Sequence, residues 1–117
     1  MSKPYNRKDR FYAQAKSEGY RSRASFKLLE LDKRFRLFRP GARVLDLGNW
    51  PGGWTQVACE SVGKNGVVVG VDLKAVQPFK PAELQIQKKS QGFITPILVT
   101  GDVNSPETQD ELRSGLG

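Results

Sequence analysis

Arg43-Val-Leu-Asp-Leu-Gly-Asn-Trp-Pro-Gly-Gly-Trp54 is the part of the sequence that says most about how the chain folds. Residues 43–48 form a short apolar run that ends on glycine, which is typical of a strand entering a turn. We expect a helix over residues 53–62, because its apolar residues share one face: Trp54, Val57, Ala58 and Val62. A strand, a glycine-rich turn and a helix in this order predict one unit of a parallel α/β sheet.

The sequence after this unit predicts two further strands and a last helix. Residues 67–73, Val-Val-Val-Gly-Val-Asp-Leu, are typical of a strand buried on both faces, and residues 96–103 predict a third strand. The polar residues 75–95 between them predict a long connection with a short helix over 82–89. A last helix is expected over 105–112, with Ser105 as its N-cap and Pro106 at its first position.

The sequence before this unit is strongly basic. The whole chain has 19 Lys and Arg, 12 Asp and Glu and a net charge of +7, and residues 1–40 carry all of the positive excess. We expect a helix with Ser22 or Ser25 as N-cap that ends before Pro40-Gly41, with one apolar face: Ala24, Leu28, Leu31 and Phe35. The charge favours contact with the phosphates of RNA. A solvated basic face and an anionic membrane surface are the alternatives.

These elements predict an α/β fold in which a parallel sheet is flanked by helices. The predicted division is a basic, largely helical, RNA-contacting segment over residues 1–40 and the first half of a larger domain over 41–117. Three parallel strands make half of a doubly wound sheet, so we expect the sheet to be incomplete after its third strand. An open edge of such a sheet favours self-association. A small autonomous domain is the alternative.

Composition excludes several functions. The chain has no histidine, so it cannot hold a Ser-His-Asp triad or a histidine-containing zinc site, and we expect no metal. Its one cysteine, Cys59, cannot form a disulfide within the chain, and we interpret it as a small buried apolar residue. The N-terminus has no apolar signal region, and no run of about 18 apolar residues could span a membrane. We therefore expect a cytoplasmic protein.

Three features predict a nucleoside site at the carboxyl ends of the strands. Gly52 and Gly53, in the turn that follows Gly48, would let the backbone approach a ligand closely. Asp72 ends the second strand and is placed to accept hydrogen bonds from a ribose diol, and Asp102 follows the third strand and is placed to meet an exocyclic amine. Each acid taken alone could equally be a surface or capping carboxylate.

Six blocks of sequence resemble the FtsJ/RrmJ family in the family's order: Arg21-Ser-Arg-Ala-Ser-Phe-Lys-Leu-Leu-Glu-Leu31, Leu37-Phe-Arg-Pro-Gly41, Val44-Leu-Asp-Leu-Gly48, Pro51-Gly-Gly-Trp54, Gly70-Val-Asp-Leu73 and Gly101-Asp102. These enzymes are S-adenosylmethionine-dependent ribose 2′-O-methyltransferases that act on RNA. The resemblance implies their Rossmann-like fold, with 23S rRNA or the large ribosomal subunit as partner.

The resemblance also assigns residues. It implies cofactor contacts by Gly52, Trp54, Asp72 and Asp102. We also expect Arg21 and Arg23 to hold phosphates of the RNA. Lys27 matches the first lysine of the family's catalytic Lys-Asp-Lys-Glu tetrad. A solvated helix lysine and surface arginines are the simpler interpretations, as is a plain core role for Trp54.

Two departures from the family pattern bear on activity. The family usually has two alanines where this chain has Asn49-Trp50, and a ring there could narrow the cofactor pocket or pack against the sheet. The other three members of the tetrad would lie beyond Gly117. A non-catalytic RNA- or nucleoside-binding module therefore remains the alternative to the methyltransferase. Half of a dinucleotide-dependent oxidoreductase is disfavoured, because the glycine spacing is not Gly-x-Gly-x-x-Gly.

Overall fold

The computed structural model describes the backbone of residues 7–117 and the side chains from residue 13 onward. Its elements, in chain order, are α1 (Arg7–Glu18), α2 (Ala24–Phe35), β1 (Arg43–Leu47), α3 (Gly53–Val62), β2 (Val67–Asp72), the short 3₁₀ helix η1 (Pro81–Leu84), β3 (Ile97–Thr100) and α4 (Pro106–Leu116). The predicted α/β order is confirmed. Residues 1–6 of the predicted basic segment lie outside the described residues.

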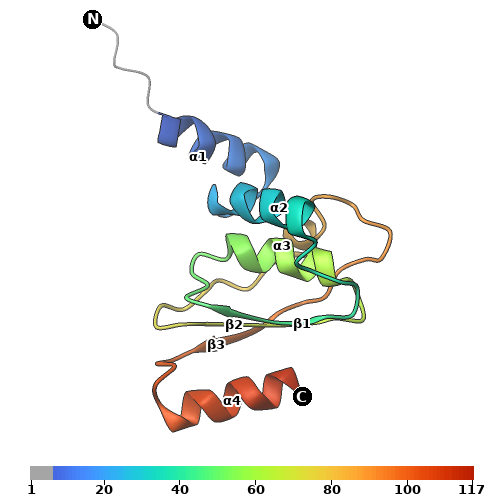
Figure 1. Ribbon diagram of the computed structural model, residues 1–117. Coiled ribbons are helices and arrows are strands. Elements are labelled where there is room, and N and C mark those ends of the chain that lie inside the picture. Colours follow the sequence, from blue (N-terminus) through green and yellow to red (C-terminus); the bar gives the residue numbers. More distant parts are fainter. Residues whose placement is uncertain (1–6) are drawn as a thin grey trace, which may run out of the picture.

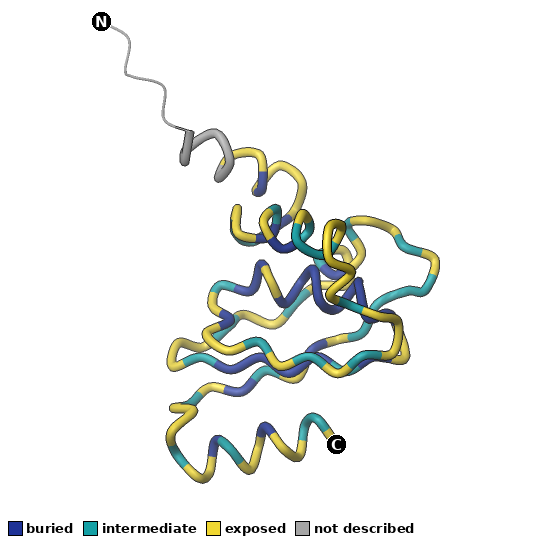
Figure 2. Tube along the Cα trace, in the orientation of Figure 1, coloured by how far each residue is buried: buried dark blue, intermediate teal, exposed yellow. Residues whose placement is uncertain are grey.

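The three strands are parallel and lie in the order β1-β2-β3, with α2 and α3 over one face of the sheet and α4 over the other (Figure 1). Val68 of β2 packs with Ala58, Cys59 and Val62 of α3 on one face. Val69 and Val71 pack with Leu112 of α4 on the other. The central strand is thus buried on both faces, as its β-branched run predicted, and Figure 2 shows the buried positions concentrated along β2 and α3.

The edges of the sheet are less covered than its centre. Leu45 and Leu47 of β1 pair with Val69 and Val71, so they point to the face covered by α4. Leu47 nevertheless remains 61% exposed. The predicted self-association through an open sheet edge stays a prediction.

The start of α2 differs from the sequence prediction. The helix begins at Ala24 after Arg23, and no side chain caps it, so the expected N-cap by Ser22 or Ser25 is wrong. Ser25 lies inside the helix, and its hydroxyl donates to the backbone oxygen of Gly53 at 2.9 Å. Because α2 packs against the start of α3, its buried positions are Ser25 and Leu28, and Ala24 and Phe35 are exposed.

The cap of α4, the short helix η1 and the burial of Cys59 can each be compared with the sequence prediction. The Ser105 hydroxyl accepts from the Thr108 backbone N–H at 3.2 Å and Pro106 begins α4, which confirms that cap. The helix expected over 82–89 is only the single turn η1. Burial raises the pKa of the Cys59 thiol to about 12, consistent with an unreactive apolar residue. No helix within residues 7–117 combines the length and the apolar character that a membrane span requires.

Candidate functional site

The turn from β1 to α3 forms a pocket at the carboxyl ends of the strands. Gly48 has a φ of 70°, and the backbone N–H groups of Gly48 and Asn49 both donate to the Val71 oxygen, at 2.8 and 3.2 Å. The turn thereby holds the N-terminus of α3 above the sheet. The space enclosed is about 290 Å³, and its walls include Asp46, Asn49, Trp50, Gly53 and Trp54. We call it the turn pocket.

Asp72 is fixed at the end of β2 by two backbone groups of its neighbourhood. Its Oδ1 accepts from the Lys74 N–H at 3.0 Å, and its Oδ2 accepts from the Trp50 N–H at 2.9 Å. These hydrogen bonds hold the pKa of the Asp72 carboxyl below its usual range, and the one from Lys74 has the largest effect. Asp72 is therefore ionised at neutral pH and keeps lone pairs for further donors.

The three strand ends lie side by side, as the sequence predicted. The Gly101 N–H donates to the backbone oxygen of Asp72 at 2.9 Å, as Gly48 does to Val71 on the other side. Asp102 follows directly and is exposed, and its Oδ1 accepts from the Asn104 N–H at 2.9 Å. The second oxygen of Asp102 has no partner among the described residues. Asp72 and Asp102 thus stand at one edge of the sheet, although neither lines the turn pocket itself.

Asp46 is a wall residue to which the sequence analysis gave no role. It is half-buried, and the Thr55 hydroxyl of α3 donates to its Oδ2 at 2.7 Å. Burial raises the pKa of Asp46, the Thr55 hydrogen bond opposes this, and the nearby charge of Asp72 raises it further. A charged residue inside the apolar run 43–48 was the available signal. Together with Asp72, it gives this end of the sheet an anionic character suited to a positively charged ligand.

The two glycines of the turn pack closely against other segments, Gly52 against Phe79 and Gly53 against Ser22 and Ser25. A Cβ on Gly52, whose φ is 122°, would lie 2.5 Å from the Phe79 ring. A Cβ on Gly53 would lie 2.5 Å from the Ser22 hydroxyl oxygen and 2.6 Å from that of Ser25. Space for neighbouring side chains is therefore a sufficient reason for both glycines. Of the two, only Gly53 also lines the turn pocket.

Both tryptophans of the turn remain accessible. Trp54 is 42% exposed and its indole Nε1–H donates to the backbone oxygen of Ala24 at 2.8 Å, so the alternative of a plain core role is wrong. Trp50 is 46% exposed, and the Lys74 Nζ lies 3.6 Å from the centre of its ring. Trp50 therefore does not pack into the sheet.

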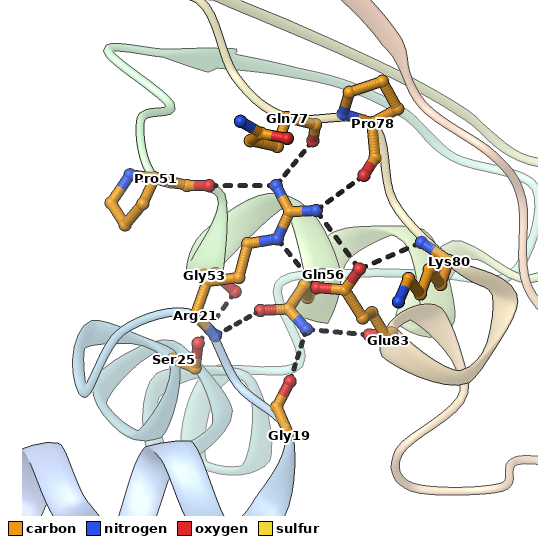
Figure 3. Close-up of polar contacts among 10 residues, drawn as sticks. All are labelled: Gly19, Arg21, Ser25, Pro51, Gly53, Gln56, Gln77, Pro78, Lys80 and Glu83. Atoms are coloured by element: carbon orange, nitrogen blue, oxygen red, sulfur yellow. Dashed lines mark hydrogen bonds and ion pairs between the residues drawn. The ribbon is translucent and has the colours of Figure 1, made fainter.

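Arg21 is held inside the protein (Figure 3). Its side chain is 14% exposed and pairs with Glu83 at 2.8 Å. Its remaining N–H groups donate to the backbone oxygens of Pro51, Gln77 and Pro78, and to the second oxygen of Glu83. All five donors of the guanidinium are used, and the group also stacks on Phe79 at 3.7 Å. The predicted phosphate contact by Arg21 is therefore wrong.

The buried Gln56 of α3 completes this arrangement. Its Oε1 accepts from the Arg21 backbone N–H at 2.7 Å, and its Nε2 donates to the oxygens of Gly19 and Glu83 at 3.0 and 2.9 Å. Arg21, Gln56 and Glu83 thus tie the start of α2, the turn and η1 together. We call these three residues the joint.

Arg23, just before α2, and Lys27, within it, are exposed and line a separate hollow of about 360 Å³. Ala24 belongs to the walls of both this hollow and the turn pocket, so the two are adjacent. Lys27 is exposed, and it lines this hollow but not the turn pocket.

The family of the chain follows from comparison with known proteins. The FtsJ-like methyltransferase family matches residues 20–117. The chain belongs to this family. Because the match includes α2, the turn and all three strands, the Rossmann-like methyltransferase fold expected from the sequence is confirmed.

Relatives and a solved structure agree with this assignment. The ribosomal RNA large subunit methyltransferase E of Methanothermobacter thermautotrophicus is 45% identical over 111 residues, which are 95% of this chain and 47% of that protein. The enzyme of the same name from Coxiella burnetii is 40% identical over 107 residues, 92% of this chain and 44% of that protein. The crystal structure of a ribosomal RNA methyltransferase from Plasmodium falciparum matches with a TM-score of 0.59 and 26% identity, over 81% of this chain and 48% of that one. The chain spans about half the length of these proteins.

Asn49, which with Trp50 replaces the two alanines usual in the family, is buried. Neither polar atom of its side-chain amide has a hydrogen-bond partner. The amide packs against Gly70 of β2, in the space that a Cβ on Gly70 would occupy. Gly70 is thus the reason that an asparagine fits where the family usually has alanine.

Among the described side chains, no group of three or more acidic or cysteine residues could hold a metal ion.

Proposed function

We propose that the protein transfers a methyl group from S-adenosylmethionine to a ribose 2′-hydroxyl of large-subunit ribosomal RNA. The observation that carries this proposal is the ionised Asp72, held by two backbone hydrogen bonds at the strand end beside the turn pocket, in a chain of the FtsJ-like methyltransferase family. An ionised carboxylate with unused lone pairs is the acceptor that a ribose diol requires.

The hydrogen-bond acceptors at the strand ends suit the donors that the cofactor carries. Asp72 would accept from the ribose hydroxyls and Asp102, through its unpaired oxygen, from the adenine amine. Gly52 and Gly53 would shape the turn, and Trp54 would form a fixed wall. The negative charges of Asp46 and Asp72 would favour binding of a positively charged cofactor. When bound, the cofactor supplies an electrophilic methyl group on a sulfonium.

Lys27 is the candidate for handling the 2′-hydroxyl. A hydroxyl is a poor nucleophile until its proton is drawn away, and an amine in hydrogen-bond reach can orient the oxygen or stabilise the developing charge. Lys27 stands in the hollow adjacent to the turn pocket, which is where a ribose presented to the methyl group would lie. Arg23 shares this hollow and would hold a phosphate of the same strand. We propose a cytoplasmic location for such an enzyme.

Methyl transfer by the natural gene product tests the proposal. The product would be incubated with labelled S-adenosylmethionine and ribosomal RNA, and the RNA would be hydrolysed in alkali. A 2′-O-methylated nucleotide resists cleavage because its nucleophilic hydroxyl is gone, so the label is expected in alkali-stable dinucleotides. Label on the bases alone would contradict the proposal.

A matched pair of variants connects the label to the strand ends. Asp72→Asn removes the charge while keeping one acceptor, and Asp110→Asn removes an exposed charge on α4. Only Asp72→Asn is expected to lower transfer. Cofactor binding without any transfer would favour the non-catalytic binding module instead.

A further inference from the structure

Trp50 lines both the turn pocket and a second, larger pocket. This second space is about 500 Å³, and its walls include Lys16, Tyr20, Ser22, Trp50 and Gln77. Trp50, Ser22 and Pro51 line both spaces, so the two pockets are neighbours. We call the larger one the Trp50 pocket.

The charge around the Trp50 pocket is positive. Lys16 and Arg21 are among its wall residues, and none of the residues that line it is acidic. Arg21 is neutralised by Glu83, but within residues 13–117 neither Lys16 nor Lys74 has an ion-pair partner. The Lys74 ammonium lies 3.6 Å from the centre of the Trp50 ring. One cation, Lys16, therefore belongs to the pocket wall, and a second, Lys74, lies against the exposed indole although it is not a wall residue.

A ligand for this pocket must satisfy both an aromatic face and cations. An unpaired nucleotide does so, since its base offers a π face to the indole and its phosphate offers negative charge to the lysines. Tyr20 and Pro51 add apolar wall, and Gln77 and the Ser22 hydroxyl add polar groups at the rim. An apolar or acidic protein segment would use only one of these two properties.

We propose that the Trp50 pocket binds one unpaired RNA nucleotide, with its base stacked on the face of Trp50 that Lys74 leaves free and with phosphates of the strand held by Lys16 and Lys74. This inference rests on the proposed function, because that function supplies RNA as the partner. The turn pocket lies between the Trp50 pocket and the hollow of Lys27, since it shares Trp50 with one and Ala24 with the other. The bound nucleotide would therefore belong to the same strand as the methylated one.

The tryptophan itself can report the contact. The chain has two tryptophans, so in a Trp54→Phe variant all tryptophan fluorescence comes from Trp50. Titration with a single-stranded oligoadenylate of about six nucleotides, within the span of one strand-binding site, is expected to quench this emission to saturation. Heparin has comparable charge but no bases, and it is expected to bind without that quenching.

Affinity variants test the same contact in the otherwise unchanged chain, by anisotropy of a labelled oligoadenylate. Trp50→Ala is expected to weaken binding by about tenfold or more, and Trp50→Phe, which keeps a ring, by about threefold or less. Lys16→Ala and Lys74→Ala should each lower the salt dependence of binding by about one ion. Lys64→Ala is the matched control, because Lys64 is an exposed lysine in the turn that precedes β2, at the opposite end of the strands.

Three results would overturn the proposal: equal quenching by heparin, unchanged oligoadenylate affinity in Trp50→Ala, or Trp50 emission that responds to S-adenosylmethionine and not to RNA. If Trp54→Phe does not fold, the affinities still decide. Failure here leaves the alkali-stability test of methyl transfer untouched. Conversely, oligoadenylate binding that depends on Trp50 would stand even if no methyl group were transferred.

Discussion

The two sides of the turn at residues 48–53 differ in how their polar groups are used. On the side of the joint, every guanidinium donor of Arg21 has a partner, and so do the carboxylate of Glu83 and the amide of Gln56. On the side of the strand ends, Asp72 and Asp102 keep unused lone pairs and two indoles are exposed. Saturated hydrogen bonding marks the part that holds the molecule together, and unsaturated hydrogen bonding marks the part that is available to ligands.

The largest expected effect concerns the catalytic site at the strand ends, and whether residues 1–117 contain all of its groups. We expect the 117-residue chain alone to be catalytically inactive, because three of the four groups of the implied tetrad would lie beyond it. Groups that act as one catalytic unit are strongly non-additive, so the loss should be roughly a thousandfold or more. Methyl transfer by this chain and by the natural gene product would be compared at equal concentration. Turnover within about tenfold would show that the site is complete here.

Breaking the joint should cost stability. Arg21→Ala leaves Glu83 and three backbone oxygens without their donor, and we expect the free energy of unfolding to fall by about 2–4 kcal/mol. Urea unfolding followed by circular dichroism measures the change. Arg21→Lys keeps the charge but loses the planar fork, so it should recover only part of the loss. A loss below about 1 kcal/mol for the alanine variant would contradict the structural role of Arg21.

Changing the strand ends should affect binding without affecting the fold. Asp72→Asn is expected to weaken S-adenosylmethionine binding roughly ten- to a hundredfold, because a charged acceptor is lost. Calorimetry gives the dissociation constant. The urea midpoint should fall only slightly, because the Asn amide can still accept one of the two backbone N–H groups that Asp72 accepts, and circular dichroism should show an intact fold. Asp110→Asn serves as the control with unchanged affinity. An unchanged dissociation constant in Asp72→Asn would remove Asp72 from the site.

The stability that the joint contributes should fall at acidic pH. The hydrogen bond from Arg21, opposed in part by burial, holds the pKa of Glu83 below its usual 4.5. The unfolded chain therefore binds this proton more tightly than the folded one, so the contribution of Glu83 to stability is full above about pH 4.5 and is lost as the pH falls below it. Urea midpoints between pH 3 and 7 measure this loss. Glu83→Gln should flatten the profile, and an unaltered profile would refute the ion pair.

The smallest effect is expected at Trp54, which belongs to both sides. Trp54→Phe removes the hydrogen bond to the Ala24 oxygen and keeps a ring on the pocket wall. The free energy of unfolding should fall by about 0.5–1.5 kcal/mol, as for a single hydrogen bond. Thermal unfolding beside the parent chain measures it. A loss above about 3 kcal/mol would mean that the indole carries packing that its exposure does not suggest.

Local patterns predicted what local forces determine. The run Val67–Asp72 predicted the central strand because β-branched residues buried on both faces leave a continuous apolar run. Ser105 predicted its cap because the partner, Thr108, is three residues away. The carboxylates Asp72 and Asp102 were placed correctly at one edge because parallel strands end together.

Long-range partners explain what the sequence could not show. Ser25 fails as a cap because its hydroxyl donates to Gly53, and Arg21 fails as a phosphate contact because its partner Glu83 is 62 residues away. A basic residue in a basic segment gives no sign that one distant carboxylate neutralises it. The buried amide of Asn49 was equally hidden, because only the register of β1 on β2 brings it against Gly70.

The joint also acts as a spacer. Arg21 lies three residues before the start of α2, and its guanidinium donates a hydrogen bond to the Pro51 oxygen in the turn. One side chain therefore fixes both the helix that carries Lys27 and a wall of the turn pocket. The separation between the proposed amine and the proposed methyl donor is therefore set by a residue that touches neither. Substitutions at Arg21, Gln56 or Glu83 would alter the rate of methyl transfer by misalignment, while every residue in contact with substrate stayed the same.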